Sequence, residues 1–202
     1  MSTPRRIAPG TTYLVTRRTT RRHFLMNPDK RRVLLAVYWY ATALLAAEFG
    51  IEIHAVQVLS NHMHEVLTDT RGELPKFLSQ RNRLMANAIK VLRGWPEEVF
   101  SREGASVVAL YGDDAVLQKI GYTLSNAVAA GLVARPEDWP GVTLAATDIG
   151  TRTIRVERPA VYFDAENKRW PASAEIAITV PRSLEANAGH EGARARIVAA
   201  VE

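Results

Sequence analysis

The chain has 202 residues, of which 47% are hydrophobic and 23% are charged, and it contains no cysteine. This composition is typical of a globular protein with one domain or two small ones. It excludes disulfides and thiolate metal sites, and it leads us to expect a cytoplasmic protein. The uncharged stretch over residues 33–47 is shorter than the roughly 20 residues that a membrane-spanning helix needs, so we expect a buried helix there and no membrane partner.

The net charge of +5 is unevenly distributed along the chain. Residues 1–32 carry nine Arg and Lys side chains against the single acid Asp29, which makes this segment about +8 and the remainder about −3. A basic segment on a nearly neutral body favours a polyanionic partner, with nucleic acid as the first candidate. The alternative is a solvated basic surface that has no partner.

Regular patterns of apolar residues predict an ordered series of strands and helices. Alternating apolar and polar residues indicate strands, and apolar residues three or four positions apart indicate helices. Asn27 followed by Pro28 has the form of an N-cap and a first helical residue, and Gly50 has the form of a helix C-terminus. In chain order we predict a strand over 11–18, a helix over 28–49, a hairpin of strands 51–59 and 62–68, a helix over 73–93, a strand over 106–111 and a helix over 113–133.

This order predicts an α+β fold, namely a ferredoxin-like sandwich in which helices pack on an antiparallel sheet. The composition changes after residue 141, so we expect a main domain over 1–141 and a small β-rich C-terminal extension of unknown role over 142–202. The chain ends within an amphipathic segment, from which we expect a longer natural protein. In the extension we predict strands over 153–157 and 175–180 and a short helix over 192–201.

Two histidines on a predicted strand form the first candidate site. His62 and His64 are two residues apart, so the period of a strand places both imidazoles on one face and Met63 on the other. Imidazole is the commonest metal-binding side chain, and two on one face can hold a single ion. The alternative is a pair of surface or hydrogen-bonded histidines.

The predicted helix 113–133 supplies a nucleophile and a third ligand. Tyr122 lies about 200° around the helix from the apolar residues Ile120 and Leu124, so it belongs to a polar stripe. Asn126 is one turn further on the same stripe, and its side-chain oxygen can complete a metal site with the two imidazoles. The alternative is an amphipathic tyrosine at a domain edge, and Tyr111 is the reserve candidate for the nucleophile.

These motifs resemble those of the REP-associated tyrosine transposases, which belong to the single-tyrosine HUH endonuclease superfamily. The string Asn61-His62-Met63-His64 is similar to the H-hydrophobic-H motif, and Tyr122-Thr-Leu-Ser-Asn126-Ala-Val-Ala-Ala-Gly-Leu-Val133 looks like the family's tyrosine helix. The resemblance covers roughly residues 5–141. Further matches are Ala8-Pro9-Gly10 before Tyr13, the arginine-rich turn 17–22 and the segment from Pro136 to Pro140.

The resemblance implies a metal-dependent endonuclease and strand transferase that cleaves and rejoins single-stranded, hairpin-containing DNA through a 5′-phosphotyrosine intermediate. It implies the HUH variant of the ferredoxin-like sandwich, with the histidines on a central strand and Mg²⁺ or Mn²⁺ as the cofactor. It leaves open whether the protein is a monomer or a homodimer. The implied roles are Tyr122 as nucleophile and His62, His64 and Asn126 as metal ligands, and we expect Arg17, Arg18, Arg21 and Arg22 to hold the DNA backbone.

The sequence departs from the family pattern at three places. Ala127 stands where a proline is usual, Glu65 follows the second histidine where a leucine is usual, and residues after Val142 have no counterpart. Because Glu65 should face the side of the sheet opposite the imidazoles, we expect it to pair with an arginine or to lie beyond the covered part of the strand. Three alternative functions remain open: a domesticated hairpin-binding protein that no longer cleaves, a replication initiator or relaxase of the same chemistry, and an RNA-binding ferredoxin-like module.

Overall fold

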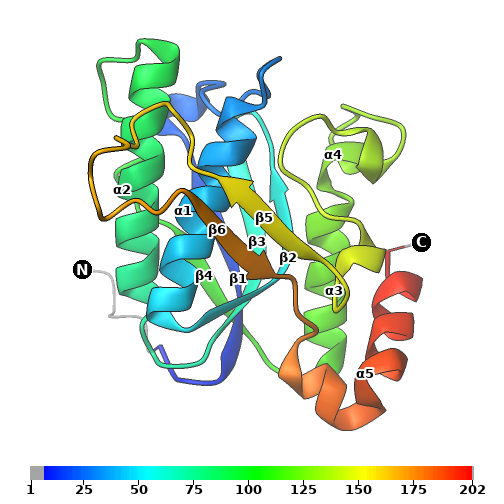
Figure 1. The fold of residues 1–202 in the computed structure, drawn as a ribbon. Helices are drawn as coiled ribbons and strands as arrows, with labels where there is room; N and C mark the ends of the chain where they lie inside the picture. The colour runs from blue at the N-terminus through cyan, green and yellow to red at the C-terminus, as the bar shows by residue number, and fades with distance from the viewer. Residues whose placement is uncertain (1–6, 202) are drawn as a thin grey trace.

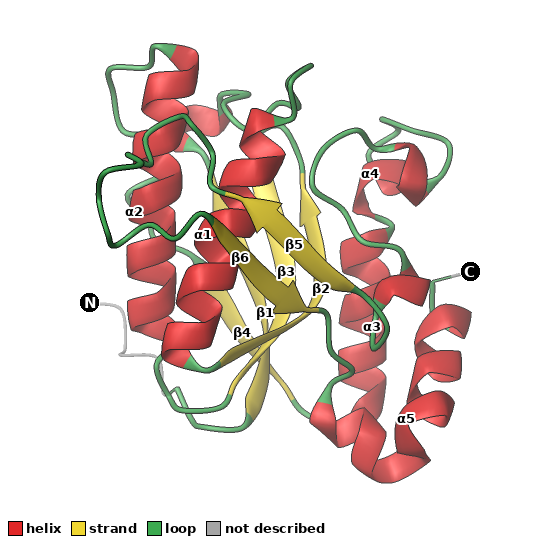
Figure 2. Cartoon of the chain, viewed as in Figure 1, coloured by secondary structure: helices red, strands yellow, loops and turns green. Residues whose placement is uncertain are grey.

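A four-stranded antiparallel sheet forms the centre of the computed structural model (Figures 1 and 2). The structure describes residues 7–201, so Arg5 and Arg6 of the basic segment lie outside it. The strand order β2-β3-β1-β4 confirms the predicted α+β ferredoxin-like sandwich, and it places β3, the strand with both histidines, in the interior of the sheet. The strands are β1 (Thr11–Arg18), β2 (Ile51–Val58), β3 (His62–Asp69) and β4 (Ser106–Leu110).

Helices cover both faces of this sheet. On one face, α1 (Val33–Phe49) and α2 (Leu74–Arg93) pack side by side, and on the other face α3 (Asp113–Leu124) packs against β2 and β3. Most of α1 is buried, as expected for a helix that is apolar on all sides. No helix within residues 7–201 is long and apolar enough to cross a membrane.

The first helix begins later than predicted. It starts at Val33 and not at Pro28, because the Asp29 carboxylate accepts hydrogen bonds from the backbone N–H groups of Val33 and Leu34, both at 2.9 Å. Arg32, just before the helix, has a left-handed backbone with φ 55°. The prediction from Asn27 and Pro28 was therefore wrong, since a longer-range cap replaces the expected one.

The predicted helix 113–133 is divided and shorter than expected. It consists of α3 and the four-residue α4 (Asn126–Ala129), separated at Ser125. The Ser125 hydroxyl donates to the Gly121 carbonyl at 2.8 Å, a back-bond that often bends a helix. Gly131, two residues after the end of α4, has a left-handed backbone with φ 68° and stops the helix from continuing to residue 133.

Residues 142–201 pack against the rest of the chain and contribute to the same hydrophobic core. The backbone runs along the free edge of β2, where Val58 N–H bonds the Val142 carbonyl and Thr179 N–H bonds the Ile53 carbonyl. A hairpin lies across the outer side of α1, where Tyr40 donates to the Pro171 carbonyl at 2.6 Å (Figure 1). The elements of this part are β5 (Thr153–Glu157), β6 (Ser173–Ala177) and α5 (Arg182–Ala199). Single 3-10 turns span Ala146–Asp148 here and, earlier in the chain, Thr20–Arg22 and Pro136–Asp138.

Within this extension the strands match the predictions closely, but the last helix does not. The strand predicted over 175–180 is β6, which begins two residues earlier and ends three residues earlier. The last helix spans 18 residues where only 192–201 was predicted, and it is kinked at Gly189, which has φ 67° and ψ 170°. The glycine interrupts the helical period, which concealed the first half of the helix in the sequence.

Candidate active site

His62 and His64 lie next to each other on the face of β3 that α3 covers. Their ring centroids are 4.9 Å apart and the ring planes are nearly perpendicular. The β1 residues Arg18 and Thr16 stand opposite them in the sheet. The alternation of the strand thus brings both imidazoles to one side, as the sequence predicted.

Each imidazole is held through its Nδ1 atom by a polar neighbour. Thr16 Oγ1 lies 2.9 Å from His64 Nδ1, and Asn61 Oδ1 lies 2.7 Å from His62 Nδ1. Because an amide oxygen can only accept, Asn61 fixes the proton of His62 on Nδ1 and leaves Nε2 with a free lone pair. Thr16 can accept in the same way from His64. Sequence reasoning missed the role of these two residues, although the cross-strand register predicts a neighbour such as Thr16.

Tyr122 projects from α3 towards His64. Its hydroxyl oxygen is 3.5 Å from His64 Nε2, and the two rings meet edge to face with centroids 5.1 Å apart. The side chain is not enclosed, since the residue is 44% exposed and accessible to a substrate. Lys119, one helical turn earlier, holds its ammonium 5.6 Å from the centre of the Tyr122 ring. Sequence reasoning missed this positive charge beside the tyrosine.

Asn126 reaches the same place from the start of α4. Its side chain lies close enough to His62 to raise the pKa of that imidazole, while Tyr122, on the preceding turn, contacts His64. The structure therefore brings together all four residues that the sequence singled out, in spite of the break at Ser125. Tyr111, the reserve candidate, is 80% exposed at the end of β4 and has no bond or ring contact with the histidines in the described part of the chain.

The surroundings keep both histidines uncharged at neutral pH. Burial lowers the pKa of His64 to about 4, and the charges of His62 and Arg18 act in the same direction. Burial also lowers the pKa of His62, as do Arg18 and Arg22, and the Asn126 side chain opposes them. Neutral imidazoles are the form that binds metals.

This donor set fits a divalent metal ion. Both imidazoles are held at Nδ1, which leaves their Nε2 atoms available to a metal, and the Asn126 side chain lies beside His62. Histidine ligands of metals are commonly oriented in this way through their second ring nitrogen. Within residues 7–201, no group of three His, Cys, Asp or Glu side chains is placed to hold a metal. An ion at this site would therefore depend on the amide of Asn126 as its third protein ligand.

The four arginines expected to hold DNA are not all on the histidine face. Arg18 and Arg22 are exposed, and their charges act on His62. Arg21 is also exposed, but it lies beside Glu97 and Glu98 in a small surface hollow. Arg17 faces the other side of the sheet, where its guanidinium lies 5.1 Å from the centre of the Phe100 ring and its Nε and Nη1 atoms are buried without a hydrogen-bond partner.

A buried ion pair supports the histidine strand from behind. Glu65, next to His64, accepts two hydrogen bonds from Arg81 of α2, at 2.5 and 2.7 Å, and one from the Tyr38 hydroxyl of α1 at 2.5 Å. All three residues have no exposed surface. The expected pairing of Glu65 with an arginine is confirmed, and it ties both helices to β3.

The overall fold has a counterpart among solved structures. A REP-associated tyrosine transposase bound to a REP hairpin matches with a TM-score of 0.55 over 70% of this chain and 81% of that one, at 21% identity. The chain has the fold of that transposase. No protein-family model and no curated sequence matches it.

Two further solved structures show a weaker similarity to this chain. A presumed transposase from Deinococcus radiodurans R1 has a TM-score of 0.40 and 17% identity, and it covers 62% of this chain and 97% of its own. The tRNA(His) guanylyltransferase from Saccharomyces cerevisiae has a TM-score of 0.42 and 12% identity over 62% of each chain. Similarity at this level does not establish a common fold.

Proposed function

We propose that the protein is a metal-dependent endonuclease and strand transferase that cleaves and rejoins single-stranded DNA beside a hairpin, as a REP-associated tyrosine transposase would. The observation that carries this proposal is the convergence of Tyr122, whose side chain is exposed, with His62, His64 and Asn126. The shared fold with a transposase bound to a hairpin supports the choice of DNA substrate.

The proposed reaction is a transesterification. The Tyr122 oxygen attacks the phosphorus of a phosphodiester, the bond to the 3′ oxygen breaks, and the phenolic proton passes through solvent to the departing 3′ oxygen. The new tyrosyl phosphodiester keeps the energy of the broken bond, so attack by a 3′-hydroxyl can rejoin the strand without ATP. A free tyrosine has a pKa of about 10, so the phenol must lose its proton during the attack.

The residues of the site divide this task. His62, His64 and Asn126 would hold Mg²⁺ or Mn²⁺, which when bound would polarise the scissile phosphate and offset its developing charge. Lys119 places a second positive charge beside the Tyr122 ring, and Arg18 adds one from β1. The exposure of Tyr122 makes its side chain accessible to a phosphate from solvent.

The proposal is tested with a labelled hairpin oligonucleotide that carries single-stranded flanks, incubated with the protein and Mn²⁺. A covalent protein–DNA adduct that resists denaturation is expected with the native protein and with the matched control Tyr111→Phe, and none with Tyr122→Phe. Chelation with EDTA should abolish the adduct. Tight binding without an adduct, under any divalent metal, would overturn the proposal and identify a non-cleaving hairpin-binding protein.

A further inference from the structure

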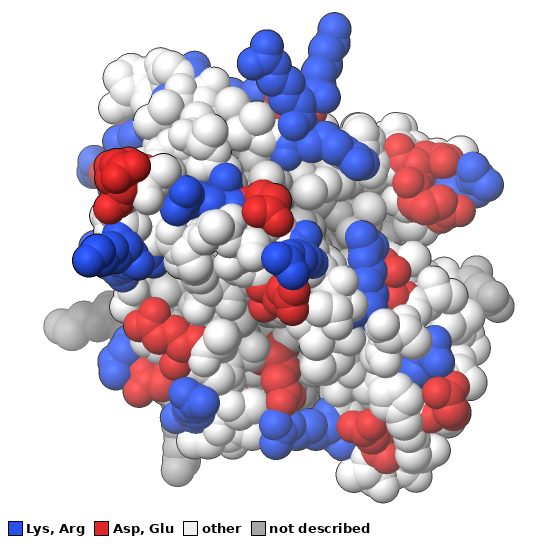
Figure 3. All heavy atoms as spheres, viewed as in Figure 1, with Lys and Arg blue, Asp and Glu red and all other residues white. Residues whose placement is uncertain are grey.

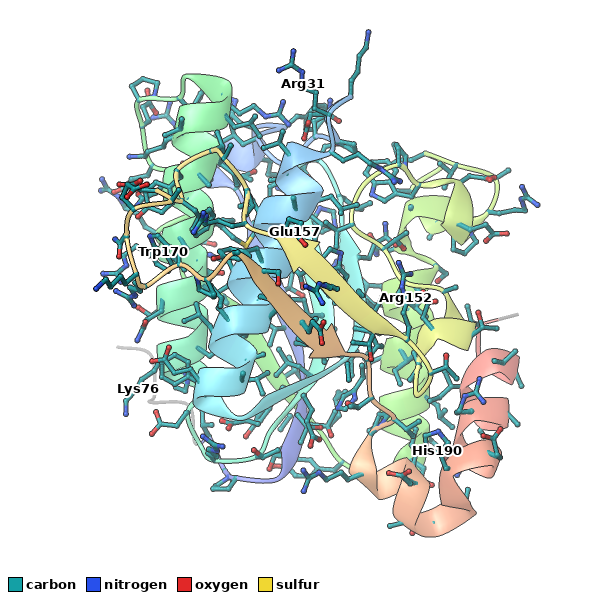
Figure 4. All side chains as sticks on the ribbon, viewed as in Figure 1. Arg31, Lys76, Arg152, Glu157, Trp170 and His190 are labelled. Atoms are coloured by element: carbon teal, nitrogen blue, oxygen red, sulfur yellow. The ribbon has the colours of Figure 1, made fainter. Side chains whose placement is uncertain are left out.

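The segment between β1 and α1, residues 19–32, combines basic side chains with an exposed aromatic ring. We call it the basic loop. Phe24 is 69% exposed, and Arg22, Lys30, Arg31 and Arg32 are exposed as well. Basic side chains project from this end of the molecule in Figure 3, and Arg31 is at the same end in Figure 4.

The part of the loop that carries Phe24 is fixed at several points. Thr19 N–H donates to the Asn61 carbonyl at 2.9 Å, and Met26 N–H donates to the Ser60 carbonyl at 2.9 Å. The two residues after Phe24, Leu25 and Met26, are buried in the core. Phe24 is thus presented to solvent by a segment whose neighbours cannot move freely.

Backbone strain is concentrated in the same loop. Arg21, Arg22 and Arg32 have φ angles of 45°, 59° and 55°, in the left-handed region that non-glycine residues rarely adopt. Such conformations persist only where the surrounding structure enforces them, and they gather at functional sites. Here the hydrogen bond from the Thr19 hydroxyl to the His23 carbonyl, at 2.7 Å, closes the turn that contains two of them.

The loop is joined directly to the candidate active site. The residue that anchors it, Asn61, accepts from Thr19 with its backbone carbonyl and from His62 Nδ1 with its side chain. Arg18 and Arg22 carry positive charge on this side, whereas on the other side the charges of Arg21 and Arg102 are balanced by Glu97 and Glu98. A polyanion that enters the site is therefore favoured along the Arg18–Arg22 side of the loop.

We propose that Phe24 is a stacking platform for an unpaired base of the DNA strand bound at this site, and that the arginines of the basic loop hold the adjacent phosphates. The inference rests on the proposed function for its ligand, single-stranded DNA beside a hairpin. A rigid exposed aromatic ring among cations is the arrangement with which proteins bind unpaired bases, because every base offers a π-face. An exposed phenylalanine on a solvated basic loop has no comparable role in folding.

The experiment uses the full chain with the Tyr122→Phe change, so that the DNA stays uncut, and hairpin oligonucleotides with 2-aminopurine at each unpaired flanking position in turn. Stacking on an aromatic ring quenches this fluorophore. We expect added quenching at one position, loss of it in Phe24→Leu with about 5- to 100-fold weaker binding, and its retention in Phe24→Trp. Tyr162→Leu, which alters a partly exposed aromatic residue beyond β5, is the matched control and should behave as the parent protein does.

The outcomes separate this inference from the proposed function. Equal binding and equal quenching in Phe24→Leu, with an unchanged melting temperature, would overturn the stacking role even if the native chain forms the adduct. Position-specific quenching that depends on Phe24 would support it even if the native chain forms none. A native protein that binds neither hairpin nor single-stranded DNA would overturn both proposals.

Discussion

The two histidines of the candidate site depend on neighbours that hold their Nδ1 atoms. Thr16 performs this role for His64 and Asn61 for His62. Partners of this kind fix the ring orientation and the tautomer of metal-binding histidines, and their loss typically lowers metal affinity 10- to 100-fold. The neighbours therefore belong to the proposed metal site as much as the ligands do.

Replacement of Thr16 by valine tests this dependence without removing a ligand. We expect Thr16→Val to bind Mn²⁺ about 10- to 100-fold more weakly than the native protein in isothermal titration calorimetry. Thr12→Val is the control, because Thr12 lies on the same face of β1 but bonds Thr68 instead of a histidine. Equal Mn²⁺ affinity in all three proteins would show that Thr16 does not orient His64.

His54 predicts a loss of stability in mild acid. It is fully buried, with Nε2 near the Thr68 hydroxyl and Nδ1 near the Thr179 carbonyl, and burial lowers its pKa from 6.5 to about 4. Above pH 6.5 the side chain is neutral in both states. Between pH 6.5 and about 4 only the unfolded state takes up the proton, so the free energy of unfolding should fall by up to about 3 kcal/mol.

This window can be measured by urea denaturation at a series of pH values. The difference in unfolding free energy between the native protein and His54→Gln should shrink as the pH falls from 7 to 4, because glutamine does not titrate and His64 contributes equally to both. Parallel pH profiles for the two proteins would contradict the assignment of a buried neutral histidine at this position.

At the scale of elements, the positions of the site residues follow from the break between α3 and α4. The Ser125 back-bond ends α3 and lets Asn126 begin a new turn beside His62. The break forms even though Ala127 stands where proline is usual in the family that the sequence resembles. Ala127 is buried against Leu59 and Trp139. The departure at Ala127 therefore does not prevent assembly of the site.

A close approach of two helices fixes the position of α3. A methyl group at Gly121 would lie 2.5 Å from the Ala200 carbonyl oxygen, next to the end of α5. We expect Gly121→Ala to lower the free energy of unfolding by about 1–3 kcal/mol, since overpacking costs that much. Gly192→Ala is the matched control, because its methyl group meets only the Ala188 side chain at 3.3 Å and should leave stability equal or higher.

Chemical denaturation compares the two glycine variants directly. A loss of stability confined to Gly121→Ala would identify the helix contact as its cause. If both substitutions stabilise the protein by a similar amount, helix propensity alone governs the two positions and α5 is not held closely against α3.

Local sequence patterns predicted most of the elements and the members of the site, whereas long-range contacts decided the rest. Alternation on β3 predicted the histidine pair, and the helical period predicted Tyr122 and Asn126 on one stripe. The start of α1 depends on the Asp29 cap, and the orientation of His62 depends on Asn61; neither is encoded in a period. From the sequence, Glu65 was recognisable only as a carboxylate that needed a partner. Its donors, Tyr38 and Arg81, come from two different helices and follow no local pattern.

At the scale of the whole molecule, the resemblance to the transposases ends near residue 141 but the hydrophobic core does not. The later residues supply Leu144, Ile178 and Leu184 to the core and cover the free edge of β2. Neither part therefore buries its apolar surface without the other. Sequence composition marks the change at residue 141, but only the tertiary contacts show that the two parts are interdependent.

Calorimetry tests this interdependence. We expect one cooperative unfolding transition, with equal calorimetric and van't Hoff enthalpies, because residues 142–201 share the core with the sheet and its helices. Two separate transitions, the first of them removed by truncation after residue 141, would contradict the shared core.

The proposed covalent bond between Tyr122 and DNA can be located by mass spectrometry. The native protein is incubated with hairpin oligonucleotide and Mn²⁺, digested with protease and nuclease, and analysed by tandem mass spectrometry. We expect a nucleotide phosphate on the peptide that contains Tyr122, and on no other tyrosine peptide. A nucleotide on Tyr111, or cleaved DNA with no protein-linked nucleotide, would contradict it.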